Sequence, residues 1–87
     1  MREIVLDTET TGLSPQNGDR VVEIGCVELI NHIATGKTYQ TYLNPQKPME
    51  PSAEEVHGLS NEFLRDQPLV EEIFRDFLDF ISKQWNK

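Results

Sequence analysis

Apolar and polar residues follow one another in the first half of this chain in patterns that predict three strands. Residues 2–6 form a short, mostly apolar run, and residues 20–31 carry Val, Ile and Cys at both alternating positions. The longer run is typical of a strand covered on much of both faces. Residues 37–43 alternate as a half-exposed strand does, and Thr35-Gly36 before them predicts the turn that pairs this strand antiparallel with its predecessor.

In the second half the spacing of apolar residues becomes helical. Residues 52–55 match a capping box that opens a short helix, which Gly58 ends, and Ser60 predicts a second brief helical turn through Leu64. From about Pro68 onwards a longer amphipathic helix is predicted. The apolar stripe of this helix, which we expect to pack on the sheet with its two phenylalanines in the core, consists of Val70, Ile73, Phe74, Phe77, Leu78 and Ile81.

The predicted fold class is α/β: a three-stranded antiparallel meander followed by short helices and one longer amphipathic helix. A chain of 87 residues buries somewhat over roughly 60% of its unfolded surface, which is enough for one modest core. The net charge of −7 is concentrated in residues 50–81, where nine acidic residues face only Arg65 and Arg75. Because no stripe of Lys and Arg is present, any contact with nucleic acid is expected to be local and metal-mediated.

The single cysteine, Cys26, falls within the apolar pattern of the second strand. This placement predicts a buried thiol in a reducing compartment rather than a disulfide. No secretory leader and no apolar run long enough to span a bilayer is found. We therefore expect a cytoplasmic protein that does not interact with membranes.

Two carboxylates stand where the first strand opens into a loop, in the sequence Asp7-Thr8-Glu9-Thr10-Thr11-Gly12. Successive side chains of a strand point to opposite faces, so Asp7 and Glu9 project from the same face. Carboxylate oxygens are hard ligands that suit Mg²⁺ or Mn²⁺, and Gly12 leaves room for a ligand to approach the backbone. The same residues are also typical of a turn without any site. A metal site for phosphoryl transfer is the favoured interpretation.

The segment from Ile4 to Leu13 resembles the first motif of the DEDD-type (DnaQ-like) 3′→5′ exonucleases. Further segments follow in the order and spacing of one branch of that family, the proofreading (epsilon) subunits of bacterial DNA polymerase III: residues 22–28, 42–45, 56–60 and 62–64. The resemblance runs from about Arg2 to about Ile81. It implies a partial ribonuclease H-like fold, a divalent metal (Mg²⁺ or Mn²⁺, two per site in intact relatives), DNA rather than RNA as substrate, and the polymerase III catalytic subunit as partner.

The resemblance also implies roles for individual residues at the 3′ end of single-stranded DNA. Asp7 and Glu9 are implied as catalytic metal ligands that also contact the substrate. Thr10 and Leu13 match family residues that meet the terminal nucleotide, although both also fit a role as loop scaffold. His57, in Val-His-Gly, matches a substrate contact, but a His before the Gly that ends a helix can instead satisfy terminal carbonyls. His32 is expected to be an exposed turn residue.

The family's second and third motifs do not follow. After His57 the chain has no histidine, and after Asp79 it has no acidic residue. Two metal ions need more than two carboxylates, and the attacking water needs a proton acceptor. We therefore expect residues 1–81 to be the N-terminal half of an exonuclease domain, inactive alone, and residues 82–87 to be a polar tail with an exposed Trp85. The alternative is a non-catalytic interaction module that uses an open sheet edge at residues 4–6.

Overall fold

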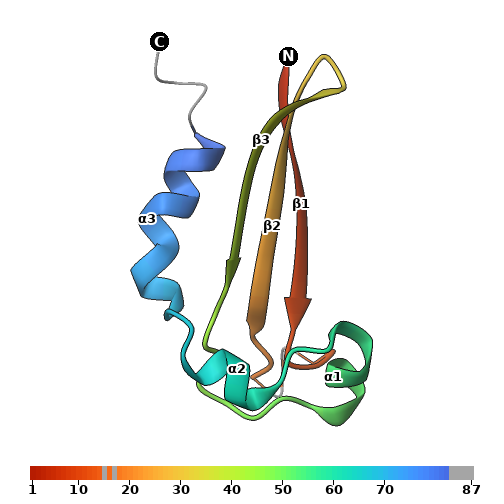
Figure 1. The fold of residues 1–87 in the computed structure, drawn as a ribbon, viewed down its shortest axis with the longest axis vertical. Helices are drawn as coiled ribbons and strands as arrows, with labels where there is room; N and C mark the ends of the chain where they lie inside the picture. Colours follow the sequence, from red (N-terminus) through yellow and green to blue (C-terminus); the bar gives the residue numbers. More distant parts are fainter. Residues whose placement is uncertain (15, 17, 83–87) are drawn as a thin grey trace.

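Three antiparallel strands form the sheet of the protein, as the sequence predicts. The computed structural model describes residues 1–14, 16 and 18–82, so the predicted tail beyond Ser82, Trp85 included, lies outside the described residues. The strands are β1 (Arg2–Thr10), β2 (Val21–Ile30) and β3 (Ile33–Tyr42), in the spatial order β1-β2-β3 (Figure 1). Within the described residues β1 is an edge strand.

The turn between β2 and β3 lies four residues before its predicted position. Asn31 and His32 have φ angles of 50° and 69° and form a two-residue connection, the type that matches the twist of the flanking strands. The prediction of a turn at Thr35-Gly36 is wrong. The pairing register shifts between Val27 and Leu29, opposite the segment that contains Gly36 at φ 90°, so this glycine marks a bulge inside β3.

Only one face of β2 is well buried, which corrects the prediction of a strand covered on both faces. Val22, Ile24, Cys26 and Glu28 are buried, whereas Val27 on the opposite face is 37% exposed. The described elements cover one side of the sheet only, so apolar residues at the other alternating positions remain partly accessible. The prediction that Cys26 is a buried thiol is confirmed.

The helices are α1 (Pro51–His57), α2 (Asn61–Arg65) and α3 (Val70–Ile81). The capping box predicted at residues 52–55 is wrong, because the N-cap lies two residues earlier: Glu50 occupies that position without a side-chain bond, and Pro51 starts the helix. Proline favours this position because its fixed φ suits the first turn. Gly58 ends α1 in the left-handed conformation, and the Ser60 hydroxyl caps α2, as predicted.

Two groups of buried residues hold the helices to the sheet. Near the end of the sheet, Val22 of β2 and Leu64 of α2 form a buried group with Met49, against which Ala53 of α1 packs. Along the sheet, Ile73 of α3 packs against β2, with Phe77 and Phe80 beside it. The predicted stripe is therefore rotated: Phe74 is 53% exposed, and Phe80, which the stripe omitted, contacts Tyr39.

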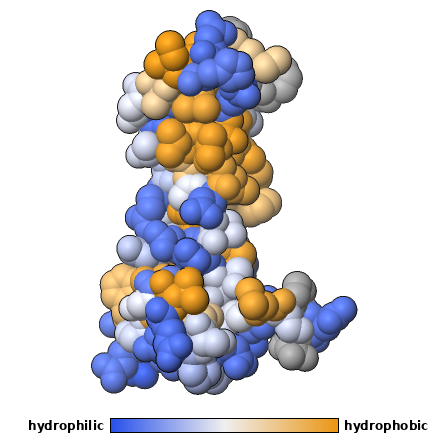
Figure 2. Space-filling view, turned by 90° about the vertical axis from the view of Figure 1, so that its right-hand side faces the viewer, coloured by the Kyte–Doolittle hydropathy of each residue, from blue (hydrophilic) through white to orange (hydrophobic). Residues whose placement is uncertain are grey.

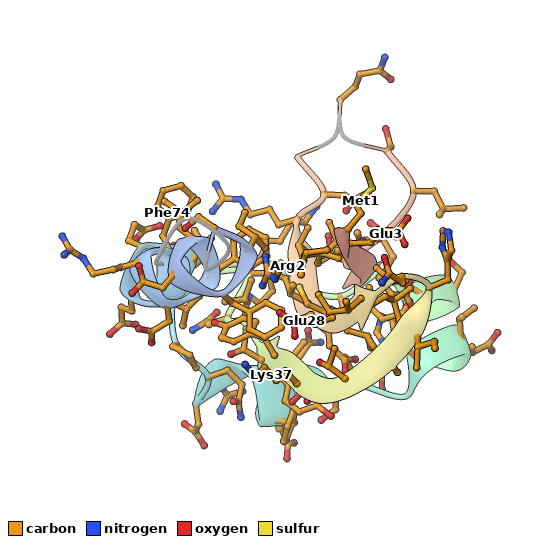
Figure 3. The ribbon with its side chains drawn as sticks, turned by 90° about the horizontal axis from the view of Figure 1, so that it is seen from above. Met1, Arg2, Glu3, Glu28, Lys37 and Phe74 are labelled. Carbon is orange, nitrogen blue, oxygen red and sulfur yellow. The ribbon has the colours of Figure 1, made fainter. Side chains whose placement is uncertain are left out.

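A buried ion pair joins the beginning of β1 to the end of α3. Arg2 Nε donates to Glu28 Oε2 at 2.5 Å, and its two terminal nitrogens donate to the carbonyls of Ile81 (2.9 Å) and Phe80 (2.6 Å) (Figure 3). Both charged side chains are less than a tenth exposed. Arg2, and secondarily the Thr35 hydroxyl, hold the pKa of Glu28 below its ordinary value. Glu28, a charged residue in an otherwise apolar strand, is thus held by tertiary contacts.

The β1 side of the sheet carries exposed apolar residues. Val5 and Leu6 are 51% and 54% exposed, and Figure 2, which looks onto this side, shows apolar surface gathered over the sheet. The open edge expected at residues 4–6 is present among the described strands.

Candidate active site

Asp7 and Glu9 project from one face of β1, near the end of the sheet where α1 lies. In the antiparallel register Asp7 stands opposite Gly25 and Glu9 opposite Glu23. Neither carboxylate forms a hydrogen bond or ion pair with any residue that the structure describes. Their oxygens are therefore available to an external cation.

Glu23 is a third carboxylate at this place, which the sequence interpretation did not assign to the site. An open hollow of about 130 Å³ is lined by Asp7, Thr8, Glu9, Glu23 and Gly25. Directly opposed like charges destabilise a strand pair, and Gln40 Nε2 offsets part of this repulsion by donating to Glu23 at 2.9 Å. Only the strand register could have revealed Glu23, because it lies far from the motif in sequence.

The donor set suits a hard divalent cation. Mg²⁺ commonly binds through one or two carboxylates while waters and substrate phosphates complete its shell. Among the described residues no group of three or more His, Cys, Asp or Glu side chains is arranged to hold a metal. Asp7 and Glu9 thus fit two ligands of an open metal site rather than a closed cage.

A second open hollow adjoins the carboxylates on the α1 side. It has a volume of about 240 Å³ and is lined by Glu9, Thr10 and Leu13 from β1 and its loop, and by Val56 and His57 from α1, among others. Leu13 is fully exposed and Val56 is 80% exposed. The structure therefore brings four of the five predicted site residues into one hollow, and Asp7 lies in the neighbouring one. Glu9 lines both.

His57 connects α1 to the carboxylate-bearing strand. The Leu59 amide donates to Nδ1 (3.1 Å), and Nε2 lies 3.1 Å from the Thr10 carbonyl oxygen. With Nδ1 accepting, Nε2 carries the proton and donates to Thr10. The interpretation of His57 as a cap for its own helix is wrong, because its ring nitrogens bond the Leu59 amide and the Thr10 carbonyl. The Glu54 carbonyl at the end of α1 accepts from the Gly58 amide instead. His32 lies in the β2–β3 turn with 86% of its side chain exposed, as predicted.

The loop after Glu9 is tightly packed at Gly12. A β-carbon at this position would lie 2.5 Å from Asp19 Oδ2 and 2.9 Å from Glu50 Cγ. The Asp19 and Glu50 side chains occupy the space that this β-carbon would fill, whereas Gly12 also lines the hollow beside α1. The expectation that Gly12 leaves room for a ligand stays a prediction. The Thr10 hydroxyl donates to the Gly12 carbonyl at 2.6 Å, which closes the loop.

Replacing Gly12 by alanine is expected to lower the free energy of unfolding by about 1–3 kcal/mol, the usual cost of overpacking. Urea denaturation followed by circular dichroism measures this change. Gly25→Ala is the matched control, because its β-carbon would meet only the Asp7 carbonyl oxygen at 3.9 Å. Equal midpoints for the two variants would contradict the tight packing at Gly12.

Comparison with known proteins finds curated relatives that match nearly the whole chain. The chain is 54% identical over 82 residues to the DNA polymerase III subunit epsilon of Rickettsia prowazekii, covering 94% of this chain and 36% of the relative. It is 46% identical over 85 residues to the subunit of the same name from Haemophilus influenzae, covering 93% and 33%. The chain thus spans about a third of the length of these curated relatives.

Solved structures with the same arrangement of strands and helices are exonucleases of ribonuclease H-like fold. Exonuclease X, solved in complex with 5′ overhanging duplex DNA, superposes with a TM-score of 0.73 at 26% identity, covering 85% of this chain and 42% of that one. A product-bound exonuclease I has a TM-score of 0.75 at 19% identity, covering 92% and 19%, and supports the fold alone.

The described residues contain no helix of sufficient length and hydropathy to cross a membrane.

The family model for the RNase T exonucleases matches residues 4–86, nearly the whole sequence. The chain belongs to the RNase T exonuclease family.

Proposed function

We propose that this chain carries the half of a DNA polymerase III epsilon-type 3′→5′ proofreading exonuclease that binds metal and the 3′-terminal nucleotide of DNA. The observation that supports this most directly is the position of Glu9, which lines both the carboxylate hollow and the hollow beside α1. A nucleotide placed across Glu9 has its phosphate beside the carboxylates and its sugar and base against Leu13 and Val56.

In this proposal Asp7 and Glu9 hold Mg²⁺ or Mn²⁺, which when bound supplies charge stabilisation for phosphodiester hydrolysis. Leu13 and Val56 offer exposed apolar surface to the terminal base or sugar. Thr10 lines the same hollow, with its hydroxyl bonded to the Gly12 carbonyl and its own carbonyl bonded to His57. His57 lines the hollow and holds the strand end against α1.

In this proposal the chain by itself binds metal and the 3′-terminal nucleotide but does not hydrolyse DNA. A general base must reach the attacking water. Both ring nitrogens of His57 are engaged within the protein, and His32 lies in the β2–β3 turn, at the opposite end of the sheet from Glu9. In an intact exonuclease of this type, further residues would supply the base, and the polymerase III catalytic subunit would be the partner.

A second candidate function is an interaction module that pairs through the β1 edge. The observation in its favour is the exposure of Val5 and Leu6 on an edge strand, since unpaired strand edges are templates for strand addition. This function needs neither metal nor DNA, so the two candidates are separable by experiment.

Fluorescence anisotropy of a 5′-labelled single-stranded oligodeoxynucleotide tests the proposal. We expect Mn²⁺-dependent binding that an unlabelled linear strand competes away, while a circular strand of the same composition, having no 3′ end, competes at least about tenfold less well. Metal-independent binding, or equal competition by the circle, would count against 3′-end recognition. Release of mononucleotides on a sequencing gel would overturn the assignment of binding without turnover.

A further inference from the structure

The loop that carries Thr10 to Leu13 is anchored by one buried carboxylate outside the site, Asp19. Its Oδ1 accepts hydrogen bonds from the Thr11 hydroxyl (2.7 Å) and from Lys47 Nζ (2.8 Å), and its Oδ2 accepts one from the Ser14 amide (3.0 Å). The Asp19 side chain is 6% exposed. Two donors from the loop and a third from Lys47, distant in sequence, therefore converge on this carboxylate.

Thr11 links the loop to two further segments, the start of β2 and the start of α1. It is fully buried; its amide donates to the Arg20 carbonyl (2.8 Å), and its hydroxyl oxygen accepts from the Arg20 amide (3.0 Å). Its own carbonyl accepts from the Glu50 amide (2.9 Å), at the start of α1. Asp19 thereby joins the beginning of β2, the loop and α1 into one unit.

The carboxylate remains charged under all ordinary conditions. Hydrogen bonds from Lys47 first, then from Thr11 and Ser14, lower the pKa of Asp19 from 3.8 to about 2. Because the folded value lies below the unfolded one, the contribution of Asp19 to stability is present above about pH 4 and is lost as the pH falls towards 2. The charge of Asp19 that holds this anchoring is thus constant above about pH 4.

The side chains of Thr10 and Leu13, which line the hollow, make few contacts that could fix their positions. The Leu13 side chain is fully exposed, and the Thr10 hydroxyl bonds only within the loop, to Gly12. Their placement therefore depends on the backbone: Thr10 ends β1, paired with Val21 beyond a register shift and bonded to His57, and Leu13 follows in the loop that Asp19 holds. Asp7 and Glu9 lie before that shift, in the regular part of the β1–β2 ladder.

We infer that Asp19, together with Lys47, is a positioning residue that sets the affinity of the hollow for the terminal nucleotide without setting the affinity of Asp7 and Glu9 for the metal. The inference rests on the proposed function for its substrate. A general loss of structure would lower both the affinity for the nucleotide and the affinity for the metal. The inference predicts that only the affinity for the nucleotide depends on Asp19.

The variant Asp19→Asn, which removes the charge and keeps the shape, tests the inference, with Asp79→Asn on the exposed surface of α3 as control. Oligonucleotide affinity in Mn²⁺ is measured by anisotropy, and Mn²⁺ affinity by water proton relaxation. We expect Asp19→Asn to weaken oligonucleotide binding about tenfold, in the range found when a supporting residue of a site is removed, and to leave Mn²⁺ affinity within about twofold. Unchanged oligonucleotide affinity, or an equal loss of both affinities, would overturn the inference.

Amide hydrogen exchange gives a readout that needs no substrate. In Asp19→Asn the amides of Ser14 and Glu50 are expected to exchange at least about tenfold faster, while those of the β1–β2 ladder keep their rates. Unchanged exchange at Ser14 and Glu50 overturns the inference whether or not the parent binds DNA. If the parent binds no oligonucleotide, the proposed function fails, and exchange still decides whether Asp19 anchors the loop.

Discussion

Replacing Asp7 by Asn and Glu9 by Gln together is expected to weaken Mn²⁺ binding by at least about 100-fold. Loss of residues that only support a metal ligand costs 10- to 100-fold in affinity, and this double variant removes the charge of both ligands while keeping their shapes. Since neither carboxylate pairs with a described residue, the fold should tolerate the change. Water proton relaxation measures the affinity, and circular dichroism checks the fold.

The control for this experiment is Glu71→Gln with Asp79→Asn, two exposed residues of α3. It changes the net charge by the same amount, so it isolates the local site from general attraction of cations by a protein of net charge −7. An equal loss in the control would show that Mn²⁺ binds to the acidic surface as a whole and would refute Asp7 and Glu9 as the ligands.

Removing the Arg2 side chain is expected to lower the melting temperature by at least about 10 °C. Breaking a buried ion pair leaves an uncompensated charge, here on Glu28, and in a domain of this size each kcal/mol corresponds to several degrees. Arg2→Ala also removes the donors that satisfy the Phe80 and Ile81 carbonyls, so the end of α3 should fray. Thermal unfolding monitored by circular dichroism measures the effect.

Two comparisons distinguish this contact from a general effect of losing positive charge. Arg75→Ala, on the exposed surface of α3, should change the melting temperature by less than about 2 °C. Arg2→Lys keeps the charge but not the fork of donors, and should fall between Arg2→Ala and the parent. If Arg2→Ala and Arg75→Ala have the same melting temperature, the contacts of Arg2 with Glu28 and with the end of α3 do not stabilise the protein.

The Arg2 contact also has a predictable dependence on pH. The pKa of Glu28 is lowered in the folded protein, so its contribution to stability is complete above the ordinary value of a glutamate and declines as the pH falls below it. The difference in melting temperature between the parent and Arg2→Ala should therefore shrink in acid.

The local patterns predicted the elements of this fold well, but not the partners of individual side chains. Strand and helix periods depend on residues a few positions apart, which is why the order of strands and helices, the Gly58 stop and the Ser60 cap agree with the structure. The turn was misplaced because both Asn31-His32 and Thr35-Gly36 are good turn sequences. Only the pairing of β2 with β3 chooses between them.

The amphipathic stripe of α3 shows the same limit. Apolar spacing defines a stripe wide enough to include both Phe74 and Phe77, but the helix meets the sheet along a narrower line. Packing selected Ile73, Phe77 and Phe80 and left Phe74 exposed. The rotation of a helix about its axis depends on the surface it covers, which lies elsewhere in the sequence.

The sequence by itself determined that Asp7 and Glu9 share a face, because alternation along a strand is local, and its motifs identified the family. The tertiary structure decided everything that depends on distant pairing. The register of β1 with β2 placed Glu23 opposite Glu9, the packing of α1 brought His57 to Thr10, and loop closure brought Lys47 to Asp19. These contacts join residues 14 to 47 positions apart, and no short-range period carries information about them.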